Sequence, residues 1–140
     1  MGNIVELREM SNDQLEEKIE DLRAEAFNLR FQVAGRRLQN TARVKEVRRD
    51  IAQIMSVLRN RQVAIDIASS QPDIANVLRD QEWTADARFV YEDSAYAVNF
   101  DVDGSEVATA QVDINKKQPR TRRERALKGR PKQIVSFDVK

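Results

Sequence analysis

The sequence lacks the two residue types on which most catalytic and metal sites depend. Among its 140 residues there is no cysteine and no histidine. The first absence excludes disulfides, thiolate nucleophiles and zinc–thiolate sites. The second removes the commonest general base and the commonest metal ligand. A carboxylate-only enzyme is left, but no pair of carboxylates stands in a glycine-rich or apolar setting. We therefore predict that the protein is not an enzyme and uses no metal or cofactor.

Long apolar runs are absent as well. No stretch of 18 apolar residues occurs, so the sequence predicts no membrane insertion. The opening residues, MGNIVELREM, have neither the basic and apolar regions of a signal peptide nor the acid-poor character of a transit peptide. We expect a cytoplasmic protein.

Charge is abundant and segregated, although the net charge is only +1. Residues 1–67 carry 12 Lys/Arg and 11 Asp/Glu, residues 68–115 carry 2 and 10, and residues 116–140 carry 10 and 2. Such segregation predicts three regions with different partners. Arginine outnumbers lysine by 17 to 7, which mildly favours RNA because the guanidinium suits bidentate phosphate contacts.

Two heptad-spaced apolar seams predict an antiparallel helical hairpin, coiled-coil-like, over residues 1–67. The first seam consists of Leu15, Ile19, Leu22, Ala26, Leu29 and Val33, and the second of Val44, Val47, Ile51, Ile54 and Leu58. Ser11 and Gln14 form a capping-box pattern, and Gly35 suits a left-handed helix end. A parallel coiled-coil dimer is the alternative. The short turn between the seams favours folding back.

The basic residues of the hairpin gather around its turn. Residues 30–61 hold nine Lys/Arg and two Asp/Glu, and several of the cations fall at the start of the second helix. Cations there oppose the helix dipole, a cost that an external polyanion offsets. This placement favours nucleic-acid binding over a merely solvated surface.

These same residues resemble a known family. The stretch from Leu7 to Ile54 is similar to bacterial large-subunit ribosomal protein twenty-nine. The match includes the Leu7-Arg8 opening, the Ser11 cap, the Phe27–Arg30 segment and Val47-Arg48-Arg49-Asp50-Ile51-Ala52. The resemblance covers roughly residues 4–63, less than half of the chain.

The resemblance implies a structural constituent of the large ribosomal subunit that lies on 23S-type rRNA near the polypeptide exit tunnel. It implies contact with ribosomal protein twenty-three, at a rim where trigger factor and the signal recognition particle dock. The rRNA-binding residues it implies are Arg30, Arg36, Arg37, Arg43, Lys45, Arg48, Arg49, Asn28, Gln32, Gln39 and Asn40. Phe27 and Phe31 could stack on a base, but their place near the seam favours packing.

The remaining residues predict a small α+β extension and a basic tail. Residues 68–115 form the acidic module, with a linker ending at Pro72, a short helix from Asp73 to about Gln81, and a two- or three-stranded antiparallel sheet. Asp103-Gly104 is a tight-turn signal rather than a calcium loop, since it lacks the EF-hand spacing. So small a module builds only a marginal core.

Residues 116–140 form a basic, largely extended arm whose last residues, IVSFDVK, alternate like a strand. The arm is a possible rRNA-binding segment that orders on binding. Its cations are Lys116, Lys117, Arg120, Arg122, Arg123, Arg125, Lys128, Arg130 and Lys132. The alternative to a ribosomal protein is a free coiled-coil adapter or a nucleic-acid-binding regulatory protein.

Overall fold

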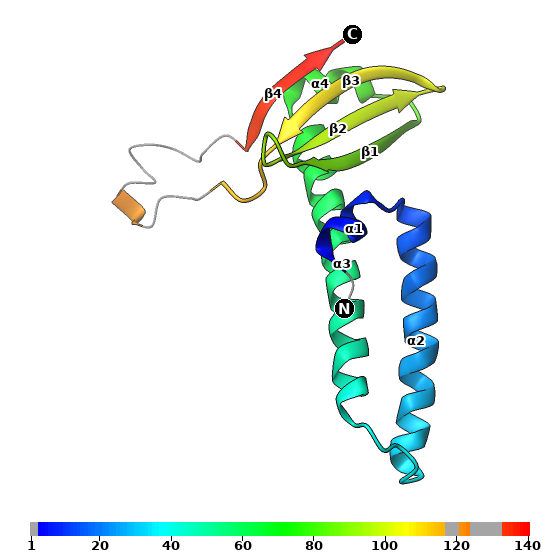
Figure 1. The fold of residues 1–140 in the computed structure, drawn as a ribbon. Helices are drawn as coiled ribbons and strands as arrows, with labels where there is room; N and C mark the ends of the chain where they lie inside the picture. The colour runs from blue at the N-terminus through cyan, green and yellow to red at the C-terminus, as the bar shows by residue number, and fades with distance from the viewer. Residues whose placement is uncertain (1–2, 117–120, 124–132) are drawn as a thin grey trace. The chain divides into compact units, whose positions relative to one another are not determined.

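The structure is a computed structural model that describes residues 3–116, 121–123 and 133–140 (Figure 1). It divides into two compact units, Met1–Arg59 and Asn60–Lys140, which we call the hairpin unit and the sheet unit. We expected a first boundary after residue 67. The division falls earlier because Ala64, Ile65 and Ala68 pack into the same core as the sheet.

Three helices build the hairpin unit: α1 (Ile4–Glu9), α2 (Asn12–Ala34) and the first part of α3 (Ala42–Ser69). The predicted capping box is confirmed. The Ser11 side chain accepts a hydrogen bond from the backbone N–H of Gln14 at 3.2 Å, and the Gln14 side chain accepts one from the Ser11 N–H at 3.0 Å. These reciprocal bonds satisfy two backbone donors that the helix itself leaves unpaired.

Residues of the predicted seams form the core of the hairpin unit. Its buried cluster consists of Leu7, Leu15, Ile19, Ile54 and Val57, with Met10, Leu22 and Leu58 packed against it. Some positions depart from the prediction. Leu7, Met10 and Val57 belong to the cluster although they lie outside the seams, and the seam residue Val33 is 47% exposed.

Arg36, and not Gly35, adopts the left-handed conformation that ends α2. Gly35 has a φ of −80°, while Arg36 has a φ of 53°. The N–H of Arg37 donates to the carbonyl of Gln32 at 2.8 Å, and the N–H of Arg36 donates to that of Val33 at 3.1 Å. This is the Schellman pattern, in which the left-handed residue is usually glycine. Our expectation for Gly35 was therefore wrong by one position.

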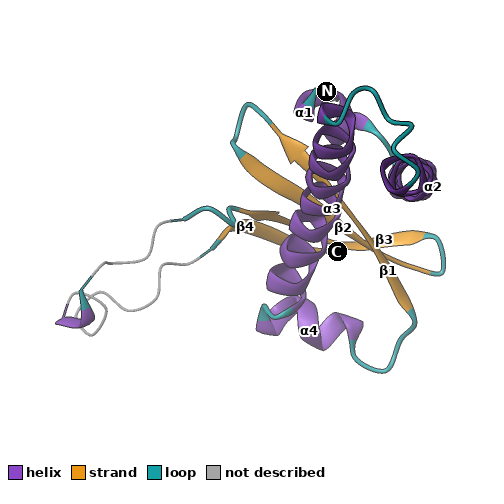
Figure 2. Ribbon diagram, turned by 90° about the horizontal axis from the view of Figure 1, so that it is seen from below, coloured by secondary structure: helices purple, strands orange, loops and turns teal. Residues whose placement is uncertain are grey.

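The sheet unit combines the end of α3 and α4 (Pro72–Leu78) with four antiparallel strands. These are β1 (Trp83–Val90), β2 (Ala95–Val102), β3 (Ser105–Val112) and β4 (Ile134–Val139), drawn in orange in Figure 2. They lie in the order β1-β2-β3-β4 (Figure 1). The predicted short helix and Asp103-Gly104 turn are confirmed. Asp103 and Gly104 have φ of 50° and 80°, as a two-residue hairpin turn requires. The closing segment, whose alternation predicts a strand, pairs with β3 and brings the sheet to four strands.

One face of the sheet packs on the helices and supplies the larger of the two cores. Tyr96, Val98 and Phe100 of β2 alternate inward and pack with Ile74 and Leu78 of α4. Trp83 packs edge-on against Phe100, with the ring centroids 5.5 Å apart. Alternation of period two thus places the apolar side chains on the helix-covered face and the polar ones on the other.

The basic segment 116–132 joins two neighbouring strands instead of forming a terminal arm. At its base the N–H of Asp113 donates to the carbonyl of Gln133 at 2.8 Å. Of the predicted arm, Lys116, Arg122 and Arg123 are described and exposed. The other cations predicted for the arm lie outside the described residues.

Candidate nucleic-acid interface

Three cations of α3 share one outward face. Lys45, Arg48 and Arg49 are exposed, and their spacing of three and four residues brings them together on the helix surface. None of them makes an ion pair within residues 3–116, 121–123 and 133–140. Arg59, exposed and likewise without an ion pair in those ranges, continues this face; sequence reasoning did not single it out. We call these four residues the α3 stripe.

A second group of free cations surrounds the end of α2. Arg30, Arg36 and Arg37 are exposed and form no ion pair in the described part of the chain. The polar side chains predicted beside them, Asn28, Gln32 and Gln39, are exposed as well. The turn therefore presents both point charges and hydrogen-bonding groups to solvent.

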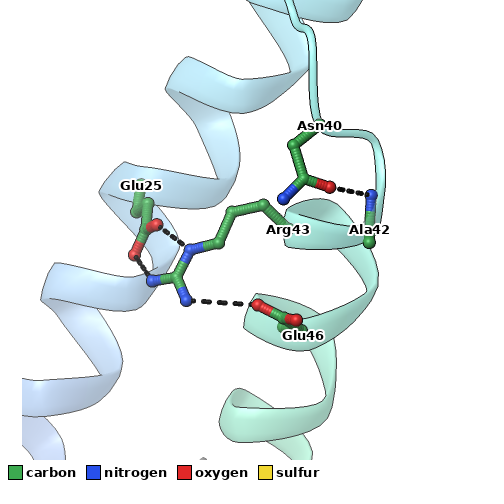
Figure 3. A network of polar contacts seen from close by, with 5 residues as sticks. All are labelled: Glu25, Asn40, Ala42, Arg43 and Glu46. Carbon is green, nitrogen blue, oxygen red and sulfur yellow. Dashed lines mark hydrogen bonds and ion pairs between the residues drawn. The ribbon is translucent and has the colours of Figure 1, made fainter.

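Arg43 differs from these cations because acidic side chains already hold it (Figure 3). Its Nε and Nη2 donate to the two carboxylate oxygens of Glu25, at 2.7 and 3.0 Å, and its Nη1 lies 3.5 Å from a carboxylate oxygen of Glu46. The hydrogen bond to Glu25 raises the pKa of the Arg43 guanidinium. Since Glu25 lies on α2 and Arg43 on α3, this fork-like pair joins the two helices next to the turn.

Asn40 also has a local role. Its side-chain oxygen accepts a hydrogen bond from the N–H of Ala42 at 3.1 Å, at the start of α3 (Figure 3). This bond satisfies one of the donors that a helix start leaves unpaired. Among the candidate ligands, Arg43 and Asn40 thus help to close the hairpin.

The two aromatic residues of α2 do not pack into the core as we expected. Phe27 is 58% exposed and Phe31 is 64% exposed. Their rings contact each other edge to face, with centroids 4.9 Å apart. Phe27 lies one position from the seam residue Ala26, and Phe31 lies two positions from Leu29 and from Val33. Each residue corresponds to a rotation of about 100° on a helix with 3.6 residues per turn, so both rings are turned away from the seam. The expectation of packing was therefore wrong.

A small cavity in the hairpin unit holds polar atoms that sequence reasoning missed. Leu7, Lys18, Leu22, Asp50, Gln53 and Ile54 line a space of about 70 Å³. One side-chain oxygen each of Asp50 and Gln53 is buried without a hydrogen-bond partner. The volume and the polar lining suit a bridging water, which would satisfy these two oxygens.

Comparison with known proteins assigns the hairpin part of the chain to a family. Residues 5–61 match the family model described as ribosomal L29 protein. The large ribosomal subunit protein uL29 of Natranaerobius thermophilus is 50% identical over 60 residues, which are 43% of this chain and 92% of that protein. The chain belongs to the uL29 family.

Further relatives give the same extent of similarity to uL29. The uL29 of Caldanaerobacter subterraneus subsp. tengcongensis is 48% identical over 60 residues, 43% of this chain and 91% of that protein. The uL29 of Symbiobacterium thermophilum is 50% identical over 60 residues, 43% of this chain and 86% of that protein. The sheet unit thus lies almost entirely outside the part shared with these relatives.

Membership of the uL29 family assigns the chain to the large ribosomal subunit, as a structural component rather than an enzyme. This confirms the family and the non-catalytic role that the sequence predicted. In the ranges that the structure covers, no helix combines the length and apolar character needed to cross a membrane.

Proposed function

We propose that the hairpin unit binds 23S-type rRNA of the large subunit through cations that no acidic side chain neutralises. The observation that carries this proposal is the contrast around α3: Arg43 is held by carboxylates, whereas Lys45, Arg48 and Arg49 are exposed and free of ion pairs in the described ranges. Binding to phosphates releases counterions from the RNA, and it needs rigid positive charge but no catalytic group.

We assign the contacts to phosphates to Arg30, Arg36, Arg37 and the α3 stripe. Asn28, Gln32 and Gln39 add hydrogen bonds to phosphate, sugar or base edges. Phe27 and Phe31, exposed beside Arg30, offer a surface on which an unpaired base stacks. Arg43 and Asn40 stabilise the hairpin next to this surface and do not contact the RNA. The basic segment 116–132 supplies a second contact to rRNA.

We further propose a position near the polypeptide exit tunnel, in contact with ribosomal protein twenty-three. There the chain contributes to the rim on which trigger factor and the signal recognition particle dock. This placement rests on the resemblance of the hairpin to the uL29 relatives.

Replacing two stripe residues tests the assignment. Arg48→Ala with Arg49→Ala should weaken binding of the full chain to the isolated rRNA domain. It should flatten the slope of log K against log salt by about 0.7–0.9 for each lost phosphate contact. Arg23→Ala with Arg88→Ala is the matched control, because it removes equal charge from residues that are ion-paired to Glu20 and Asp86. An unchanged slope, or an equal change in the control, would contradict the assignment.

The proposed location has a separate test. Since the chain contains no cysteine, Gln39→Cys gives a single site for a photo-crosslinker. In large subunits carrying the variant, we expect crosslinks to rRNA and to ribosomal protein twenty-three at the tunnel exit. Crosslinks confined to another part of the subunit would overturn the placement, and failure to sediment with subunits in high salt would favour a free adapter.

A further inference from the structure

The outer edge of β4 presents unpaired backbone groups. β4 is the last strand of the sheet, and among the described residues no strand pairs with its outer side. The N–H of Lys140 donates to the carbonyl of Val107 on β3 at 2.9 Å, so every second residue of β4 directs its backbone toward β3. The residues between them, Phe137 and Val139, direct their N–H and C=O groups to the open edge.

The side chains at this edge are apolar and incompletely covered. Val135 is 57% exposed and Phe137 is 41% exposed. Phe137 and Val139 are paired with Ala110 and Ala108, which are buried against the helices, so they belong to the helix-covered face.

A groove runs along β4 on this face. Its volume is about 580 Å³, and it is lined by Ile67, Ser70 and Gln71 on the helical side and by residues 133–137 on the strand side. α4 lies against β3 and β4 (Figure 1), so the helical layer borders the position that a fifth strand would take.

The other edge of the sheet is protected. On β1, Asp86 and Arg88 are exposed and ion-paired to each other at 3.2 Å. Charged side chains of this kind discourage edge-to-edge pairing. On β4 the only charged residue is Asp138.

The charge around the groove indicates which occupant fits. Asp138, which is paired with Thr109, lies on the open face of β4, and the N–H of Asp113 donates to the carbonyl of Gln133 just before that strand begins. Residues 68–115 carry two Lys/Arg against ten Asp/Glu, so an RNA strand, or the same residues of a second copy, would meet like charge. Basic side chains on the occupant would be attracted.

We propose that the outer edge of β4 and its groove bind an extended segment of another protein, in which apolar and basic residues alternate, as a fifth strand of the sheet. The backbone of the segment bonds to Phe137 and Val139, and its apolar side chains enter the groove. Its basic side chains point away toward the open face of the sheet. Strand addition of this kind draws affinity from the main chain and specificity from alternate side chains.

Peptides with blocked backbone amides test the geometry. The probe is an acetylated, amidated hexapeptide of alternating lysine and valine, titrated into the ¹⁵N-labelled full chain. Valines opposite Phe137 and Val139 share their face, so the valine N–H groups are those that bond to β4. N-methylation of the valines should weaken binding about tenfold or more, whereas N-methylation of the lysines should leave it nearly unchanged. The amides of Phe137 and Val139 should become protected from exchange.

Protein variants supply the matched control. Val135→Lys places a cation at the exposed edge and should weaken binding of the probe, while Thr84→Lys on β1 should not. Equal effects of the two methylated peptides, or shifts outside β4, would overturn the proposal. The proposal would also fail if the amides of Phe137 and Val139 were already protected in the free protein because the protein dimerises. It would fail as well if residues 117–132 protected them, in which case deleting those residues would remove the protection.

Discussion

The hairpin unit and the sheet unit use their apolar and charged residues in opposite ways. The hairpin buries five residues in its cluster and leaves Phe27 and Phe31 exposed, whereas the sheet unit buries twelve and packs Trp83, Phe89 and Tyr96 against other rings. The hairpin displays cations without ion pairs in the described ranges, while the sheet unit divides its charge between acidic residues 68–115 and basic residues 116–132. A unit with little core and an unneutralised charged face gains stability from a bound partner. The sheet unit has the larger core and can be stable without a partner, contrary to our expectation of a marginal core.

The largest effect is expected from a substitution at the centre of the larger core, which tests whether the two units are stable independently. Phe100 is fully buried, so Phe100→Ala should cost about 3–5 kcal/mol of the free energy of unfolding of the sheet unit. Trp83, the only tryptophan, packs on Phe100 and reports the change by fluorescence during denaturation. RNA binding by the hairpin should survive. Its loss in parallel with the Trp83 signal would show that the units are not separable.

A smaller effect is expected at Arg36, a cation whose backbone adopts the strained left-handed conformation. Arg36→Gly should stabilise the hairpin by about 0.5–1 kcal/mol, because glycine adopts the left-handed conformation without a Cβ penalty. Arg37→Gly removes the same charge from a residue without positive φ and should bring no such gain. Thermal denaturation followed by circular dichroism compares them. Equal stability of the two variants would contradict the assignment of strain to Arg36.

The smallest effect is expected from a substitution of Arg43, which tests whether this residue stabilises the hairpin or binds RNA. Arg43→Ala removes the pair with Glu25 and should lower the midpoint of hairpin unfolding slightly, since the pair is partly exposed and screened by salt. The salt slope of RNA binding should stay close to that of the unmodified chain, in contrast to the Arg48 and Arg49 variant. If Arg43→Ala reduced the salt slope as much as the loss of one residue of the α3 stripe, Arg43 would have to be counted among the residues that contact phosphates.

Local patterns predicted most of the secondary structure. The Ser11 cap, the two helices, the Pro72 helix start and the Asp103-Gly104 turn each depend on residues within a few positions, so the sequence was sufficient. The alternation of IVSFDVK predicted a strand, but its pairing with β3 across residues 113–133 has no local signal. Contacts between distant residues, such as Glu25 with Arg43, were likewise invisible to spacing. The candidate cations could be selected from sequence, but not divided into paired and free.

The pair that joins α2 to α3 also shapes the field around the hairpin. Glu25 and Glu46 flank Arg43 and offset its charge, so the strip beside the turn has little attraction for a polyanion. Past this strip, Lys45, Arg48, Arg49 and Arg59 lie along about 21 Å of helix, at 1.5 Å per residue. A phosphate backbone approaching the hairpin would accordingly be steered lengthwise along α3, and the two carboxylates would separate its contacts on the α3 stripe from those on Arg30, Arg36 and Arg37.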